Sequence, residues 1–370
     1  MCAKITNNKS TSIINTNIII FMKLKNVTQL FIIAFVLMCI VPSCVKEGPI
    51  GLSGTDGTNG TDGEAGTVTC LACHSGTNME QKKAEFAMSE HSAGAIAVEY
   101  AGGRASCAPC HSHEQFVQFA ATGLPIAGDI TNPSAWKCST CHGIHTTFES
   151  KDYALRKSAA IVSVVATNGT MDLKGSSNLC ATCHQARSAE PNVDKPGATY
   201  AVSTRIGPHH GPQANVVFGK GFAEIPGSVT YPVAGSADHL TKANGSCVGC
   251  HMGTFTAKQG GHSYIPSLAA CNTCHGGTAI KNYNYGGVQS DVQTKLDLLR
   301  DKLVALGVIV VGKDAVDPSI ITYTPKSGTV PMVRAQAVFN YYGIKEDRSL
   351  GVHNPKYVRA LLVNSLEALN

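Results

Sequence analysis

The sequence predicts a mainly α-helical protein with long loops, built around an internal scaffold that side chains alone do not supply. Only 6% of the 370 residues are aromatic and there is a single Trp, so few bulky side chains are available for a large core. Between residues 67 and 287, helical periodicity is short and is broken by Gly, Pro, Asn and Thr. From residue 288 onward, apolar residues recur at helical spacing.

Residues 1–43 have the pattern of a bacterial export signal. Met22, with two lysines close behind it, is a better translation start than Met1. The apolar run Leu30–Val41 is too short to span a bilayer comfortably. The sequence Val-Pro-Ser-Cys that ends at Cys44 resembles a lipobox, whose cysteine is lipidated and becomes the first mature residue. The alternatives are an ordinary signal peptide and a retained membrane anchor.

The net charge of +5 belongs largely to this export signal. Residues 1–43 contain four lysines and no acidic residue, and their removal leaves 26 basic and 25 acidic residues. There is no basic patch with interleaved aromatic residues, so nothing in the sequence supports a nucleic-acid partner.

Residues 44–66 form a glycine-rich segment with a period of three. The glycines are Gly48, Gly51, Gly54, Gly57, Gly60, Gly63 and Gly66. Collagen has this period because only glycine fits at its axis, but the run is too short and too poor in proline for a stable triple helix. We expect a flexible, collagen-like tether.

Fifteen cysteines suggest either a disulfide framework or a cofactor protein, and their spacing distinguishes the two. Cys2, Cys39 and Cys44 lie in the N-terminal region. The other twelve form six Cys-x-x-Cys-His motifs. The cysteine pairs are Cys70 and Cys73, Cys107 and Cys110, Cys138 and Cys141, Cys180 and Cys183, Cys247 and Cys250, and Cys271 and Cys274, and the histidines that follow them are His74, His111, His142, His184, His251 and His275.

This motif is the attachment signal of c-type haem. Two thiols three positions apart reach the two vinyl groups on one porphyrin edge, and the next residue, His, binds the iron as its proximal ligand. Zinc sites pair two Cys-x-x-Cys motifs without requiring that His, and a redox dithiol needs one motif in a βαβ setting. The sequence therefore predicts six haem c groups, whose large apolar bodies supply the missing scaffold.

Eight further histidines are available as distal iron ligands. His113 follows His111 too closely to reach the far face of its own haem. His209 and His210 are adjacent, so one of them is expected to be a ligand, and we select His210. The predicted distal ligands are His91, His145, His210, His239, His262 and His353. For His353 the alternative is a surface histidine near the start of a helix.

Residues 288–370 contain no Cys and are expected to form a helical region that packs on the hexahaem domain, residues 67–287. The first helix is predicted by an apolar stripe at steps of four and three, formed by Val292, Leu296, Leu299, Leu303 and Leu306.

Two more helices are predicted in this region. The stretch from Val330 to Tyr342 suggests one that stops at Gly343. Asn354 and Pro355 form a good N-cap and first-turn pair for the other. Its expected apolar face consists of Val358, Leu361, Leu362, Leu366 and Leu369.

The six motifs and spare histidines resemble bacterial multihaem cytochromes c. Three stretches give this resemblance more specifically: Ser89-Glu90-His91, Cys141-His142-Gly143-Ile144-His145, and residues 207–212. The tail from Gly351 to Tyr357, with its Leu-rich helix, resembles the C-terminal helical region of the nitrite-reductase-like superfamily. The resemblance covers about residues 70–370 and implies a mostly helical protein with stacked haems. Ammonia-forming nitrite reductases typically carry a Cys-x-x-Cys-Lys motif, whereas all six motifs here end in His.

The predicted function is electron transfer outside the cytoplasm. Bis-His iron is coordinatively saturated, which favours a carrier over an enzyme. The expected partners are other cytochromes or redox proteins, a small inorganic acceptor, and the outer membrane or cell surface through a lipid anchor, with the periplasm as the alternative location. The main alternative is a multihaem oxidoreductase acting on nitrite, hydroxylamine or a sulfur oxyanion at one five-coordinate iron. A subunit that assembles into a longer haem chain is a third hypothesis.

Overall fold

The computed structural model describes residues 76–94, 97–124, 127–144, 154–192, 197–243, 246–276 and 280–370. These residues belong to one compact unit, Ala65–Asn370. Several predicted features lie outside them: the export signal with Cys44, the glycine-rich tether, the first motif from Cys70 to His74, and His145.

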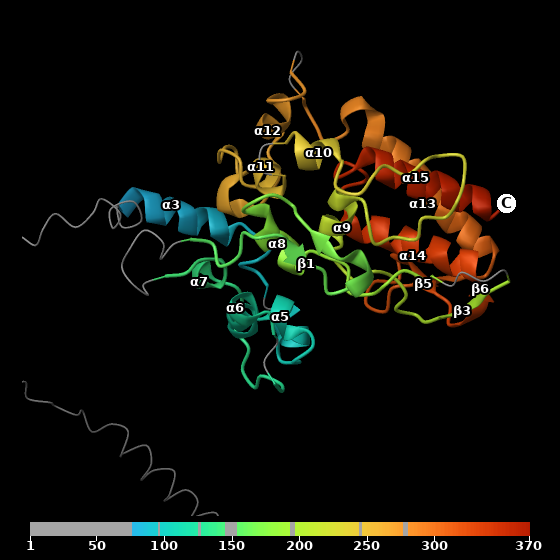
Figure 1. The fold of residues 1–370 in the computed structure, drawn as a ribbon, viewed down its shortest axis with the longest axis horizontal. Coiled ribbons are helices and arrows are strands. Elements are labelled where there is room, and N and C mark those ends of the chain that lie inside the picture. The colour runs from blue at the N-terminus through green and yellow to red at the C-terminus, as the bar shows by residue number, and fades with distance from the viewer. Residues whose placement is uncertain are drawn as a thin grey trace, which may run out of the picture. The chain divides into compact units, whose positions relative to one another are not determined.

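The haem-motif half of the protein consists of short helices joined by long loops, as the sequence predicts (Figure 1). Its helices are α3 (Gly76–Ala87), α5 (Ala108–His111), α6 (His113–Thr122), α7 (Cys138–Cys141), α8 (Ser177–Cys183), α9 (Gln213–Phe218), α10 (Asp238–Thr241), α11 (Cys247–His251) and α12 (Leu268–Asn272). Single turns occur at η1 (Val98–Gly102), η3 (Ala166–Asn168), η4 (Gly261–Ser263) and η5 (Tyr285–Gly287).

Three long helices dominate the C-terminal region: α13 (Val288–Ala305), α14 (Met332–Asp347) and α15 (Pro355–Ala368). They pack against one another (Figure 1). The first carries the predicted stripe, of which Val292, Leu296, Leu299 and Leu303 are buried. The third begins as predicted, because the side chain of Asn354 accepts a hydrogen bond from the backbone N–H of Tyr357 at 3.2 Å.

The prediction that the second helix stops at Gly343 is wrong. The helix begins at Met332 and continues through Gly343 to Asp347. Glycine is needed there for close packing, since an added Cβ would lie 2.2 Å from the Phe222 ring. The helix ends instead where Arg348 adopts a left-handed conformation with φ of 62°.

In the described residues, strands pair only as three short antiparallel ladders. They are β1 (Ile161–Val162) with β2 (Thr170–Met171), β3 (Thr199–Val202) with β6 (Gly328–Pro331), and β4 (Ile309–Lys313) with β5 (Ile321–Pro325). The β3–β6 ladder joins the middle of the chain to the segment just before α14 (Figure 1). This ladder links the C-terminal helices to the haem-motif half.

Most of the apolar core lies among α13, α14 and α15, where Leu299, Val338 and Leu361 are fully buried. The loop after α9 contributes Phe222 and Ile225 to the same core. A smaller cluster surrounds α8 and includes Ile161, Met171, Leu173, Leu240 and their neighbours.

By contrast, the described part of residues 76–144 is almost without a side-chain core. Its buried hydrophobic residues are Val98, Ala101, Ala108 and Phe116. The described part of residues 76–144 therefore depends on something other than side-chain packing for its order. No described helix combines the length and apolarity needed to cross a membrane.

Candidate haem-binding sites

The five described motifs all lie on short helices or at their ends: α5, α7, α8, α11 and α12. Positions i and i+3 share one face of a helix, so both thiols of a motif project from the same side. None of the ten described motif cysteines forms a disulfide. Within the described residues there is also no group of three or more His, Cys, Asp and Glu that could enclose a bare metal ion.

The histidine side chains instead lie close together in pairs. Each of the five described proximal histidines has the ring of a non-motif histidine close to its own. The pairs and their ring-centre distances are His184 with His91 at 6.0 Å, His111 with His209 at 6.4 Å, His142 with His262 at 6.3 Å, His251 with His353 at 6.3 Å, and His275 with His239 at 6.1 Å.

This spacing suits two imidazoles on opposite sides of one iron. A metal–imidazole bond is about 2 Å long and the nitrogen lies about 1 Å from its ring centre, so two axial rings have centres about 6 Å apart. Four of the five pairs join residues about a hundred positions apart in the chain. The fold therefore brings together donor pairs that fit a haem iron.

Hydrogen bonds at Nδ1 prepare four of these imidazoles for metal binding. The acceptors are Gln213 Oε1 for His184 at 3.2 Å, the Val352 carbonyl for His239 at 2.6 Å, the Tyr264 carbonyl for His251 at 2.7 Å, and Asp347 Oδ1 for His353 at 2.6 Å. A carbonyl or carboxylate oxygen carries no proton, so Nδ1 must donate. Nε2 then keeps the lone pair that a metal ligand needs.

At His353, burial is outweighed by the charge and hydrogen bond of Asp347, which raise the pKa. At six of the other proposed ligands, burial favours the neutral imidazole. It lowers the pKa of His91 to about 4, and the nearby His184 adds to the effect. Burial and then the neighbouring His210 lower the pKa of His209 to about 4. Burial is also the main cause of lowered pKa values at His111, His184, His251 and His262. A neutral imidazole is the form that binds metal.

The structure brings His209, and not the predicted His210, next to His111. His210 points away: its Nδ1 donates to Glu346 Oε2 at 2.9 Å, and 78% of its side chain is exposed. His209 has a left-handed backbone with φ of 80°, which a residue with a Cβ adopts at some cost. Such conformations persist mainly at functional sites, where the surroundings hold them.

The remaining histidines are His113, which is not among the predicted ligands, and two predicted ligands outside the described residues. His113 has a hydrogen bond of 2.8 Å between its Nδ1 and the Thr140 hydroxyl, which ties the start of α6 to the α7 motif. His74 and His145 lie outside the described residues, as do Cys70 and Cys73.

The motif helices adjoin one another in space. The Cys110 thiol of α5 lies 4.0 Å from the Thr182 carbonyl of α8, and the Cys183 thiol of α8 lies 4.0 Å from the Pro109 carbonyl of α5. This reciprocal contact places the second and fourth motifs back to back.

The fourth motif also adjoins two others. The backbone N–H of Val248 in α11 donates to the Ser177 hydroxyl of α8 at 3.2 Å. Burial and then the thiols of Cys247 and Cys141 raise the pKa of Cys180 to about 12, which shows how near the third and fifth motifs are. Helix α12 packs against α11. The α8 motif is therefore the common neighbour of three others.

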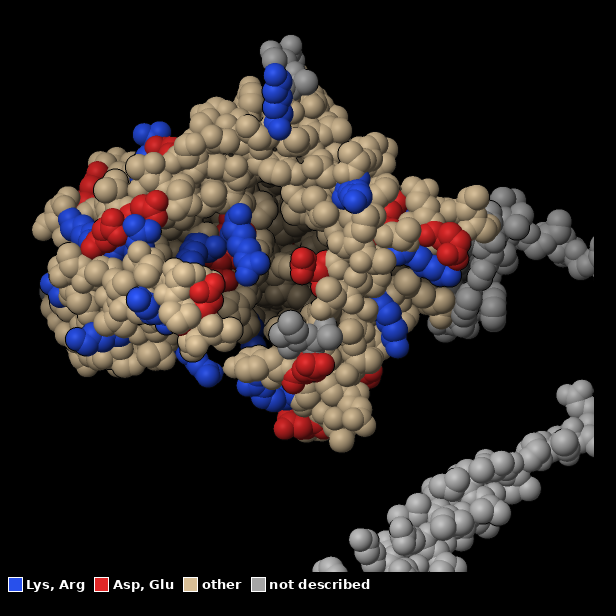
Figure 2. All heavy atoms as spheres, turned by 180° about the vertical axis from the view of Figure 1, so that it is seen from behind, with Lys and Arg blue, Asp and Glu red and all other residues tan. Residues whose placement is uncertain are grey.

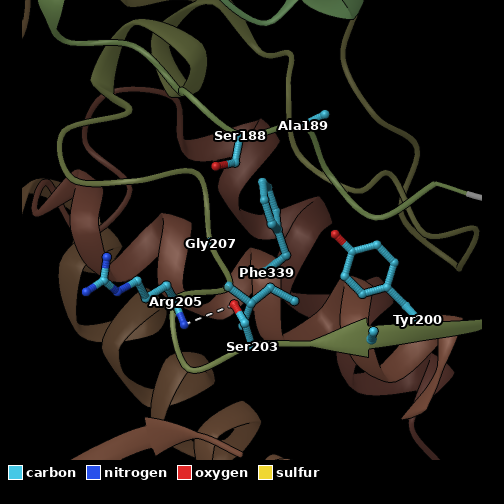
Figure 3. Close-up of a pocket in the computed structure, with 9 residues that line it drawn as sticks. Ser188, Ala189, Tyr200, Ser203, Arg205, Gly207 and Phe339 are labelled. Atoms are coloured by element: carbon cyan, nitrogen blue, oxygen red, sulfur yellow. Dashed lines mark hydrogen bonds between the residues drawn. The ribbon is translucent and has the colours of Figure 1, made fainter. Parts of the chain in front are cut away.

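The cavity in Figure 3 is a separate feature, lined by Ser203, Arg205, Gly207 and Phe339 among others. The Ser203 hydroxyl there accepts a hydrogen bond from the Arg205 backbone N–H at 3.2 Å. Its volume of about 140 Å³ is well below the ~300–1,000 Å³ of ordinary ligand sites. It contains no motif cysteine or histidine, so it is not a haem site.

On the face in Figure 2, basic and acidic side chains are interspersed, and the surface is hollowed near its middle. This mixture agrees with the near balance of charge outside residues 1–43. A partner that docks on this face would not meet a surface of a single sign.

Comparison with known proteins gives relatives of one kind. C-type polyheme cytochrome OmcB from two strains of Geobacter sulfurreducens is 25% identical over 258 residues, which cover 56% of this chain and 34% of OmcB. C-type polyheme cytochrome OmcC from Geobacter sulfurreducens is 26% identical over 159 residues, covering 37% of this chain and 20% of OmcC. No protein-family model matches.

Among solved structures, the Outer Cell Wall Cytochrome OcwA matches with a TM-score of 0.49 and 20% identity, over 78% of this chain and 50% of that protein. The chain spans about a third of the length of OmcB and less of OmcC.

The motifs and these relatives support a multihaem c-type cytochrome. The relatives named are polyhaem cytochromes and not nitrite reductases, so they do not support the narrower resemblance to the nitrite-reductase-like superfamily.

Proposed function

We propose that this chain is an extracytoplasmic electron carrier that binds six c-type haems, each between two imidazoles. The observation that carries the proposal is the set of five histidine pairs whose ring centres lie 6.0 to 6.4 Å apart. Haem iron supplies the reversible one-electron chemistry. The chain fills both axial positions, which leaves no open site for a substrate and favours transfer over catalysis.

The ligand pairs follow from the geometry. We assign His91 to the iron of His184, His209 to that of His111, His262 to that of His142, His353 to that of His251, and His239 to that of His275. His145 then remains for the iron of His74. His113 and His210 are assigned no iron, since the proximal histidine of each described motif lies close to a different non-motif imidazole.

The contacts between motif helices support an order for the haems. We propose a row that runs from α5 to α8, α11 and α12, with the α7 haem beside that of α8. The haems of α5 and α8 would stack as a pair, because their motifs touch back to back. Electrons would pass along this row, and the α8 haem would be its branch point.

Two measurements on purified, matured protein test the proposal. The mass should equal that of the polypeptide and its lipid plus six haems, and electron paramagnetic resonance of the oxidised protein should show low-spin iron only. A high-spin ferric signal that responds to nitrite or hydroxylamine would show an open iron and favour an oxidoreductase. Colourless protein would refute haem binding altogether.

The choice between His209 and His210 gives a matched pair of variants. His209→Met should replace one bis-His haem by a His–Met haem, with an altered low-spin signal and a raised reduction potential, because a Met ligand raises the potential. His210→Met should leave all haem spectra unchanged, since His209 and not His210 lies against the proximal His111. Spectral change in His210→Met and none in His209→Met would reverse the assignment.

We further propose that Cys44 carries a lipid that anchors the chain to a membrane at the outer surface of the cell. The support is the order of export signal, lipobox-like cysteine and glycine-rich segment in the sequence. One lipidated cysteine with two or more acyl chains gives stable anchoring, whereas a single chain is marginal. The redox partners would be cytochromes or other electron carriers at that membrane.

The anchor is tested by Cys44→Ala, with Cys39→Ala as the control in the same segment. Cys44→Ala should move the cytochrome from the membrane fraction to the soluble fraction without changing its haem content. Cys39→Ala should remain with the membrane. Equal membrane retention of the two variants, measured by haem absorbance after fractionation, would contradict lipidation at Cys44.

A further inference from the structure

The distal ligand His353 forms a short hydrogen bond to a buried carboxylate. His353 Nδ1 donates to Asp347 Oδ1 at 2.6 Å, and the Asp347 side chain is fully buried. Asp347 is the last residue of α14, and the left-handed Arg348 turns the chain back so that His353 reaches it. Ser349 donates to the other carboxylate oxygen with both its backbone N–H and its hydroxyl.

The Asp347 carboxylate pairs with His353 at 2.6 Å. Among the described residues, no Lys or Arg forms an ion pair with Asp347. Glu85, the acidic residue near His262, differs: it forms an ion pair with Lys82 at 3.0 Å and lies 3.5 Å from His262 Nδ1. The acceptors at His184, His239 and His251 are uncharged amide or carbonyl oxygens.

The proximal ligand of the same pair is also strongly hydrogen-bonded. His251 Nδ1 donates to the Tyr264 carbonyl at 2.7 Å. The pair of His251 and His353 combines a carboxylate bond on one imidazole with a short carbonyl bond on the other. Both bonds make the imidazoles stronger electron donors to a metal.

We propose that Asp347 is a positioning residue that holds the haem of His251 and His353 at the low-potential end of the array. The inference rests on the proposed function, since it requires an iron between these two imidazoles. In the redox step one electron enters ferric iron and gives ferrous iron. No bond forms or breaks, and the Nδ1 proton stays in place.

The physical reason is electrostatic. A ferric bis-His haem iron has one more positive charge than the ferrous form, and a buried negative charge nearby stabilises it more strongly in a low-dielectric interior than it would in water. Hydrogen bonding of an axial ligand and burial are two of the means by which a protein sets a haem potential. Asp347 supplies both a hydrogen bond to an axial ligand and a buried negative charge, so this haem should be among the last to accept an electron.

The test compares two variants that each remove one negative charge from adjacent positions. Asp347→Asn keeps the shape and an acceptor oxygen but removes the charge. Glu346→Gln removes a charge that faces His210, which is not an assigned ligand. Spectroelectrochemical titration of the holoprotein should show one low-potential component of Asp347→Asn moving upward by about 59 mV, which is a tenfold change for a one-electron couple. Glu346→Gln should leave that component in place.

The outcomes separate this inference from the proposed function. Asp347→Asn with six low-spin haems and no shifted component would overturn the role of Asp347 while leaving bis-His ligation intact. If Asp347→Asn fails to bind all its haems, His353→Met supplies the test. The redox component that shifts in His353→Met is expected to lie at the low-potential end of the titration. A shift of a high-potential component instead would overturn the proposal. No spectral change in His353→Met would refute the ligand assignment itself.

Discussion

Protein made without haem attachment should lose the order of residues 76–144 while keeping its C-terminal helical core. The reason is the unequal distribution of side-chain packing. The described part of residues 76–144 buries four hydrophobic residues, whereas α13, α14 and α15 share a large apolar cluster. Burying a flat apolar haem replaces the missing contacts, and its thioether bonds restrict the unfolded chain much as a disulfide does.

Limited proteolysis followed by mass spectrometry would measure this effect segment by segment. Cleavage between residues 76 and 144 should accelerate strongly in the apoprotein, since each ~1.4 kcal/mol of lost local stability raises the cleavable population about tenfold. Peptides from residues 288–370 should remain protected, and circular dichroism should retain a helical signal. An apoprotein with uniform, holo-like protection would show that the side chains are a sufficient scaffold.

Removing the haem of α8 should divide the electron path in two. We expect Cys180→Ala combined with Cys183→Ala to separate the α5 haem from those of α11 and α12, because α8 lies between these motifs. Electron tunnelling falls steeply with distance, so redistribution across the gap should slow by orders of magnitude. Time-resolved absorbance after reduction by less than one electron per protein would show a new slow phase.

The matched control removes a haem at the end of the row. Cys271→Ala combined with Cys274→Ala also leaves five haems, but the remaining motif helices still adjoin one another. Its redistribution should stay fast. Mass and low-spin signals establish that each variant retains five intact haems. Equal kinetics in the two variants would contradict the role of α8 as the branch point.

Those features of the fold that depend on local sequence were predictable. The motif spacing predicts the number of haems and their proximal ligands, since Cys-x-x-Cys-His is a contiguous signal. The apolar stripe of α13 and the Asn354 cap of α15 are likewise short-range patterns, and the structure confirms both. The β4–β5 hairpin was not predicted, although its residues Val310 and Val311 are typical of strands.

Those features that depend on contacts between distant segments could not be predicted. His209 and His210 are the same residue type in adjacent positions, and only the left-handed backbone at His209 and the contact of His210 with Glu346 distinguish them. Gly343 resembles a helix terminator until Phe222 is placed against it. Nothing in the sequence near Asp347 marks it as the partner of a ligand six residues later.

The histidine pairs also have a consequence for the order of assembly. In four of the five pairs the second imidazole lies about a hundred residues from the first, and His353 follows every other assigned ligand in the chain. Closing such distant contacts is entropically costly and slow. We therefore expect haem attachment at the α11 motif to precede completion of its iron site, which requires the loop after α14 to have folded. For that interval the α11 haem would have a vacant axial position, so the same cytochrome could bind small ligands while immature that it excludes once mature.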